Sequence, residues 1–178
     1  APVPSPPDKG EKVADRPDEG AATIAGRPTE PLCSLVLHRP LIPDPAKETL
    51  ALRQAAAATA LLRLSAAEKV WPVFQDQPDP RVRSYLQHRL ASYGVDPQSV
   101  LTQLPQEIDV SRQRSLILGI GEFARAKSLS PEQQTAAVAD LAKRYAADPD
   151  SGIHGAAEWA LRQLGAEATI AEVRAAYS

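Results

Sequence analysis

The sequence of 178 residues has one cysteine, no methionine and only 4% aromatic residues. A single thiol, Cys33, excludes an intrachain disulfide framework and any zinc or iron–sulfur site built from several cysteines. It fits a reducing compartment, and we interpret it as an inert thiol. The absence of methionine argues against the flexible Met-rich groove of promiscuous binding proteins. These scarcities exclude disulfide-stapled domains and multi-cysteine metal proteins.

The chain also lacks a strong charge imbalance and a long apolar run. Its formal net charge is −2, which suggests no surface for a polyphosphate. The apolar stretch Ala55–Leu62 is rich in alanine and far shorter than the roughly 20 residues that cross a membrane. The first residues show neither the charged region nor the apolar run of a signal peptide. We therefore expect a soluble, cytoplasmic protein with no membrane partner.

Proline divides the sequence into two parts. Ten of the 17 prolines lie in residues 1–45, whereas alanine and leucine dominate the rest. Prolines remove backbone donors, and the few apolar residues of 1–27 are scattered among charged ones. We predict that residues 1–45 are a Pro-rich linker or arm, disordered or extended, whose residues 31–45 are apolar enough to lie along the first helix. Residues 46–178 then form the folded domain.

From Ala46 onward the apolar residues recur at helical spacing, and no window alternates like a strand. We predict eight helices and essentially no sheet. Ser65–Glu68 fits a capping box, Asp96–Pro97 places an N-cap before a first-turn proline, and Ser130–Gln133 combines both signals. The predicted apolar stripes are Leu52, Ala56 and Ala60; Val82, Leu86 and Leu90; Leu116, Ile120 and Phe123; and Ile153, Ala157, Leu161 and Leu164.

The longer predicted helices resemble one another when they are aligned. If Leu52, Val82, Arg112 and Ile153 are equivalent, the spacings are 30, 30 and 41 residues. The last spacing matches HEAT or armadillo repeats, of about 40 to 47 residues, so the first units need short second helices. Tetratricopeptide repeats, of about 34 residues, fit less well because their Trp-Leu-Gly-Tyr pattern is missing. We predict a HEAT-like α-α superhelix, a right-handed solenoid of about four helix pairs. Its interior should include Leu86, Leu90, Leu116, Ile120, Trp159 and Leu161.

No residue pattern predicts a catalytic, cofactor or metal site. His38, His88 and His154 match no metal-ligand or catalytic motif, and we interpret them as structural or surface residues. His154 has Glu158 four residues on and could pair with it on the helix surface. Gly119-Ile120-Gly121 lacks the third glycine and the preceding strand of a dinucleotide loop. These glycines are expected to let neighbouring helices approach closely. We predict no catalytic residue, no cofactor and no metal.

Carboxylates on different predicted helices are the one possible source of a catalytic site that the sequence leaves open. Glu122, Asp140, Glu158 and Glu172 fall on different predicted helices. Two of them about 5 to 10 Å apart in a concave pocket would suit acid–base chemistry. We expect them instead to be dispersed and solvated, each near an arginine or lysine.

Arginines between residues 81 and 125 are the only basic concentration. They are Arg81, Arg83, Arg89, Arg112, Arg114 and Arg125. In a shared groove they would hold phosphates, as in HEAT-like DNA glycosylases. Six acids lie between Asp76 and Arg125, the stretch that contains these six arginines, so the net field is small. We favour a structural ladder of turn acids and helix arginines, with Trp71 and Trp159 used for packing. The alternative is a HEAT-like nucleic-acid-binding or modifying enzyme that uses the Arg81 to Arg114 region.

Several blocks of the sequence resemble the helical-repeat segment of large planctomycete-type bacterial proteins. The blocks are Arg53–Leu64, Glu68–Pro72, Pro78–Leu86, Gly121–Phe123 and Asp148–Trp159. In that family the segment precedes a formylglycine-generating-enzyme-like (sulfatase-modifying-factor) domain and often follows a Ser/Thr kinase domain. The resemblance implies a HEAT-like module that joins or regulates catalytic domains, and it carries over no catalytic residue. We therefore expect a non-catalytic scaffold that contacts a partner protein or a covalently linked catalytic domain. A nucleic-acid partner is not expected.

Overall fold

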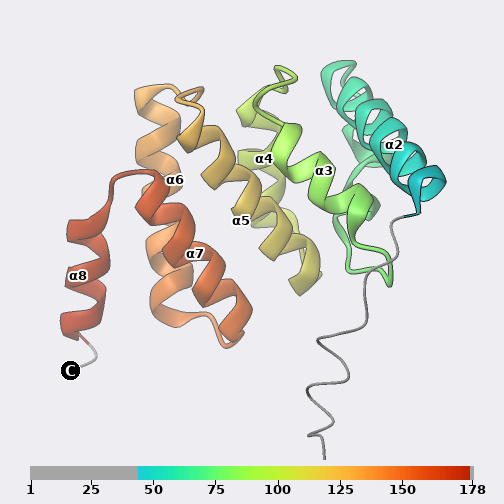
Figure 1. The fold of residues 1–178 in the computed structure, drawn as a ribbon. Coiled ribbons are helices and arrows are strands. Elements are labelled where there is room, and N and C mark those ends of the chain that lie inside the picture. The colour runs from blue at the N-terminus through green and yellow to red at the C-terminus, as the bar shows by residue number, and fades with distance from the viewer. Residues whose placement is uncertain (1–43, 177–178) are drawn as a thin grey trace, which may run out of the picture. The chain divides into compact units, whose positions relative to one another are not determined.

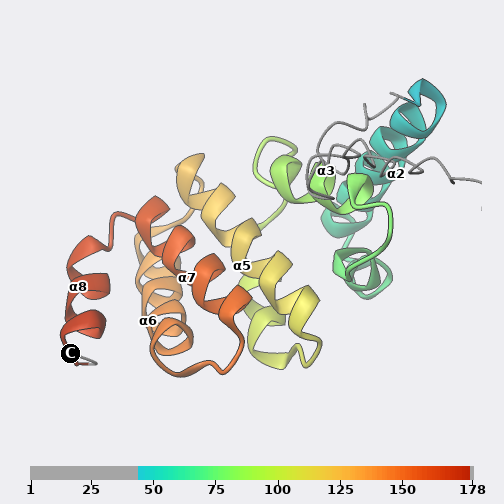
Figure 2. The same ribbon diagram turned by 60° about the horizontal axis from the view of Figure 1, so that its bottom comes forward.

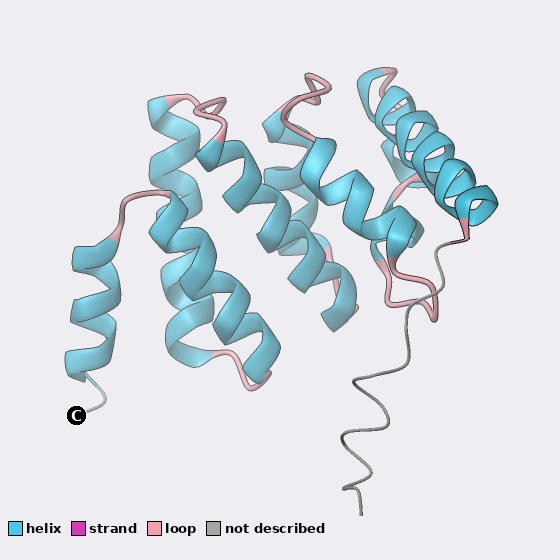
Figure 3. Cartoon of the chain, in the orientation of Figure 1, coloured by secondary structure: helices cyan, strands magenta, loops and turns pink. Residues whose placement is uncertain are grey.

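The fold is that of a computed structural model, which describes residues 44–176. Over this range the chain is helical and contains no strand, which confirms the predicted all-α class (Figure 3). No helix in this range combines the length and apolar character needed to cross a membrane. The predictions for the Pro-rich arm, Cys33 and His38 lie outside the described residues. The described residues belong to one compact unit.

The helices follow one another as four hairpins. The long helix α2 (Pro45–Arg63) is followed by two short 3₁₀ helices, η1 (Ala67–Lys69) and η2 (Trp71–Phe74). The second hairpin consists of α3 (Arg81–Arg89) and α4 (Pro97–Gln103), which η3 (Leu104–Gln106) extends. The third and fourth consist of α5 (Val110–Arg125) with α6 (Pro131–Ala147), and α7 (Ser151–Gln163) with α8 (Glu167–Ala176). The second members of the first two hairpins are short, as the 30-residue spacing predicts.

These helices pack in two layers. Helices α2, α3, α5 and α7 lie side by side in chain order, and each contacts the next (Figure 1). The second layer contains η2, α4, α6 and α8, in which α6 contacts both α4 and α8. Figure 2 shows α6 alongside α7, the helix of the first layer against which it packs most extensively. Each hairpin therefore places one helix in each layer.

Side-chain caps fix where most of the helices begin. Asp44, Asp96, Asp109 and Asp150 each precede a helix, and their carboxylates accept a hydrogen bond from a backbone N–H of the first turn. A cap of this kind stabilises a helix by about 1 kcal/mol. The predicted capping box at Ser130 is present, since the Ser130 hydroxyl and the Gln133 side chain bond reciprocally to each other's backbone N–H.

The capping box predicted at Ser65 is wrong. Ser65 has a φ of 59°, in the left-handed region, and η1 begins after Ala66 without a side-chain cap. The segment that follows is not an α-helix either, because Pro72 lies in the second of two separate 3₁₀ helices. Proline removes the N–H that a continuous helix would need at this point.

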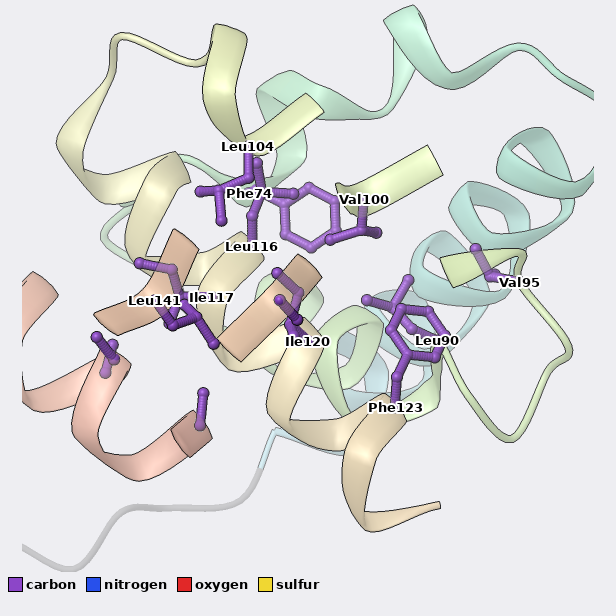
Figure 4. Close-up of a cluster of buried hydrophobic side chains, with 14 of the residues drawn as sticks. Phe74, Leu90, Val95, Val100, Leu104, Leu116, Ile117, Ile120, Phe123 and Leu141 are labelled. Atoms are coloured by element: carbon purple, nitrogen blue, oxygen red, sulfur yellow. The ribbon is translucent and has the colours of Figure 1, made fainter. Parts of the chain in front are cut away.

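The apolar side chains meet in one cluster between the layers. Figure 4 shows Phe74, Leu90, Leu116, Ile120 and Phe123 among the side chains of this cluster. The predicted interior residues Leu86, Leu90, Leu116, Ile120 and Leu161 are buried, whereas Trp159 is only half-buried. The stripe predicted for α2 is wrong, because Ala56 and Ala60 are exposed. The buried residues of this helix are Ala51, Ala55, Ala58, Thr59 and Leu62.

Two glycines of α5 allow the first layer to pack closely. A Cβ on Gly119 would lie 2.9 Å from Leu90 Cδ1, which belongs to the end of α3. A Cβ on Gly121 would overlap the indole ring of Trp159 on α7. Both glycines are buried. The expected role of these glycines as points of close helix approach is therefore seen on both sides of α5.

Candidate functional site

All six arginines of the basic concentration have partners within the described part of the chain. Two of them link neighbouring helices of the first layer. Arg114 Nη2 on α5 lies 3.3 Å from Oδ1 of Asp150, the N-cap of α7. Arg81 Nη1 on α3 lies 3.7 Å from Glu48 Oε2 on α2, and its Nη2 lies 2.7 Å from Asp79 Oδ2 in the preceding turn. These contacts have the pattern of the expected structural ladder.

The other four arginines are held by residues of their own or an adjacent element. Arg83 pairs with Asp76, Arg112 Nη1 lies 3.4 Å from Glu107 Oε2, and Arg125 Nη2 lies 2.5 Å from Glu122 Oε2. The Arg89 guanidinium lies 5.4 and 5.5 Å from the ring centres of Tyr85 and Tyr93, and its Nη1 donates to the Tyr93 hydroxyl at 2.9 Å. All six arginines are thus engaged in contacts within the fold.

The carboxylates of the ladder are stabilised in their charged form. A hydrogen bond from Arg81 lowers the pKa of Asp79 from its ordinary value. The Ser111 hydroxyl lowers the pKa of Asp109, and the backbone N–H of Ile153 lowers that of Asp150. These shifts come from caps and ion pairs that exist only in the folded chain.

We expect the thermal midpoint of unfolding to stay level from pH 7 to about pH 5 and to fall below about pH 4. Because these pKa values are lower in the folded chain, the carboxylates stabilise it above their ordinary pKa of 3.8. That stability is lost as the pH falls through the folded values. Circular dichroism melts at each pH measure the effect, and Asp150→Asn should make the fall shallower. A midpoint that rises on acidification would contradict the assignment.

Glu122 is buried, which corrects the expectation that its carboxylate is solvated. Only 7% of its side chain is exposed, and Oε1 lies 2.8 Å from Nδ1 of His88 on α3. His88 and Arg125, its two partners, are themselves 65% and 63% exposed. The carboxylate therefore bridges α3 and α5, and its contacts with the exposed His88 ring and the exposed Arg125 guanidinium compensate its burial.

The remaining suspected carboxylates have different partners. Asp140 Oδ2 lies 2.8 Å from Arg144 Nε, while Glu158 Oε1 accepts from Arg162 and Arg174. Glu172 is exposed on α8. Among the described residues, no group of three or more His, Cys, Asp or Glu side chains could hold a metal ion.

His154 and Glu158, which the sequence allows to pair, have other partners. His154 Nε2 bonds to the backbone carbonyl of Asp148, in the turn before α7, and its ring lies edge-on to Tyr145. Glu158 is instead bound by arginines and by the Tyr145 hydroxyl, which donates to Oε2 at 3.2 Å. The Arg162 hydrogen bond lowers the pKa of Glu158. Stronger, charge-assisted donors thus displace the histidine.

A groove of about 420 Å³ lies in the second layer, between α4 with η3 and α6. Its apolar lining comes from Leu101, Leu104, Pro105, Ile120, Ala136 and Ala137. Its polar lining comes from Gln98, Thr102, Glu132, Gln133 and Asp140. Two carboxylates and no basic side chain therefore line an otherwise apolar hollow. Sites of this volume, with a few polar groups on an apolar surface, are typical of ligand and peptide pockets.

The polar side chains at the groove are themselves held in place. Gln133 Nε2 donates to Gln98 Oε1 at 3.4 Å, from α6 to α4. Glu132 Oε2 accepts from the Ser130 hydroxyl at 2.8 Å, and this bond lowers the pKa of Glu132. Arg144, the partner of Asp140, also reaches the Leu104 carbonyl at 3.4 Å.

No pattern in the sequence predicts this groove. Its two walls, α4 and α6, lie about 35 residues apart in the chain, and neither carries a ligand-binding motif. The only available signal was the pair of small residues Ala136-Ala137 in α6, which leaves room opposite Leu101.

The chain was compared with protein-family models, with curated proteins and with solved structures, and none of the three comparisons found a match.

Proposed function

We propose that residues 46–178 are a HEAT-like, right-handed solenoid that serves as a non-catalytic scaffold for contacts with a partner protein or a linked catalytic domain. Four consecutive hairpins, each with one helix in each of two layers, support the repeat architecture. Repeat arrays of this kind bury their apolar faces by stacking and offer extended surfaces to partners.

The observation that carries this proposal is the groove between α4 and α6. In this groove apolar side chains such as Leu101 and Pro105 combine with polar ones along the edge. The arginine and histidine side chains that first suggested chemistry are instead engaged in intramolecular contacts. A protein surface is thus better supported than a reaction centre.

The alternative, a nucleic-acid-binding or modifying enzyme that uses Arg81 to Arg114, receives less support. An arginine that already pairs with a carboxylate must break that pair before it binds a phosphate. Arg81, Arg83, Arg112 and Arg114 all have such partners.

Titration of the chain with a fluorescent DNA duplex at low and moderate salt tests the two functions against each other. We expect no DNA binding at moderate salt. A protein whose arginines are already paired with carboxylates attracts DNA only weakly and non-specifically, and salt screens that attraction. Affinity that persists with a steep salt dependence, and that falls in Arg83→Gln, would overturn the scaffold proposal.

We also propose that this scaffold is a regulatory or linking module of a larger bacterial protein of the sulfatase-modifying-factor or kinase type, located in the cytoplasm. This part rests on the resemblance of blocks such as Asp148–Trp159 and on the single cysteine. The sequence of the gene on both sides of this segment checks it. A downstream formylglycine-generating-type domain is expected, and an unrelated neighbour would contradict it.

A further inference from the structure

We propose that the groove between α4 and α6 binds an extended peptide segment of the partner, with apolar side chains on its floor and a lysine or arginine against Glu132. This inference rests on the proposed scaffold function and names the chemistry of its partner. Three features of the groove lead to it: its apolar floor, its unbalanced charge and its amide side chains.

The apolar floor of the groove favours a peptide with apolar side chains. Leu104, Ile120 and Ala137 are buried at its base, while Leu101 is only partly covered and Pro105 and Ala136 are exposed. A leucine-sized side chain placed here removes apolar surface from water on both partners, at about 25 cal/mol per Å². The volume of about 420 Å³ has room for a small number of side chains but not for a whole helix.

The negative charge of the groove favours a peptide with a cationic side chain. Asp140 is balanced by Arg144, whose guanidinium is also fixed to the Leu104 carbonyl. Glu132 takes part in none of the ion pairs of residues 44–176, and its recorded side-chain partner is the neutral Ser130 hydroxyl. Because that hydroxyl lowers the pKa of Glu132, the carboxylate is charged at neutral pH. A lysine or arginine beside the apolar anchor complements it.

The amides favour an extended segment over a helix. Gln98 and Gln133 face each other across the groove through a hydrogen bond of 3.4 Å, longer than the usual 2.9 to 3.0 Å. Gln133 Nε2 and Gln98 Oε1 can exchange this bond for bonds to a backbone C=O and a backbone N–H, while Gln133 Oε1 keeps its bond from the Ser130 N–H and Gln98 Nε2 its bond to the Thr102 hydroxyl. An extended segment has such groups free, whereas a helix uses its own internally.

Fluorescence anisotropy with the full chain tests the proposal. The probe is a fluorescein-labelled peptide, Gly-Ser-Lys-Leu-Ser-Leu-Lys-Ser-Gly, compared with one in which glutamate replaces both lysines and one in which serine replaces both leucines. We expect saturable binding of the first peptide and at least about tenfold weaker binding of the others, a difference of about 1.4 kcal/mol.

Two lysine substitutions on α6 form the matched pair of variants. Ala136→Lys places a charged side chain in the groove and should weaken binding at least about tenfold. Ala139→Lys, also exposed on α6 but outside the lining, should leave binding unchanged. Lysine is a good helix former, so both variants should keep the helical circular dichroism signal. Glu132→Gln should weaken binding about two- to fivefold, as expected for one exposed ion pair.

The outcomes separate this inference from the scaffold function. Equal binding of the lysine and glutamate peptides, lost in Ala136→Lys, would overturn the cationic partner and leave a scaffold with a purely apolar site. No binding of any peptide, or equal binding by both α6 variants, would overturn the groove as the peptide site. The scaffold function itself fails only if the chain binds DNA in the salt titration described above.

Discussion

Leu86→Ala should lower the free energy of unfolding by about 2 to 5 kcal/mol. Leu86 lies on α3 with no exposed surface, inside the cluster that joins the two layers. Its truncation loses the transfer free energy of the side chain and leaves a cavity that packed neighbours only partly fill. Urea unfolding, followed by the helical circular dichroism signal, measures the change in the free energy of unfolding.

Leu50→Ala is the matched control for this substitution. The substitution removes the same atoms from a side chain on α2 that is 54% exposed. It should change the free energy of unfolding by no more than about 0.5 kcal/mol. A loss below about 1 kcal/mol for Leu86→Ala would place this side chain outside the core and contradict the arrangement of α3.

Gly121→Ala should lower the free energy of unfolding by about 1 to 3 kcal/mol, although alanine is the better helix former. The added methyl group would overlap the indole ring of Trp159, so α5 and α7 must move apart or the ring must turn. Gly155→Ala is the control, because a Cβ at this position on α7 meets nothing within 4 Å. That variant should gain about 0.5 to 1 kcal/mol from helix propensity alone.

A double-mutant cycle identifies the cause of the loss. If the indole ring is the obstacle, Gly121→Ala should cost much less in a Trp159→Ala background, so the two effects will not add. Additive effects would show that the strain at Gly121 comes from another neighbour.

The sequence predicted the fold best where apolar residues stand out from their surroundings. Leu86 and Leu90 lie among arginines, histidine and glutamine, so only one face of that helix can be buried. In α2 the run Ala55–Ala58 is apolar on every side, and its contacts with α3 decide which alanines are buried. The phase of that helix was predicted wrongly because alanine gives no contrast between faces.

The polar contacts were less predictable, since they depend on residues far apart in the chain. The burial of Glu122 depends on His88, 34 residues earlier, and no local spacing indicates that pair. The groove depends in the same way on how α4 and α6 meet. Caps such as Asp96 and Ser130 were correct because their hydrogen bonds are local. The cap predicted at Ser65 was wrong because Pro72, seven positions later, prevents the long helix that this cap would have started.

The order of the hairpins also bears on how the chain folds during synthesis. In residues 44–176 the extensive helix contacts join elements close along the chain, and α2 shares none with α6, α7 or α8. Folding rates rise as contacts become more local, and domains with such contacts fold in microseconds to milliseconds. The ribosome adds only about 5 to 20 residues per second. Each hairpin therefore has time to pack on its predecessor as it emerges, so the array can be built one unit at a time from its N-terminal end.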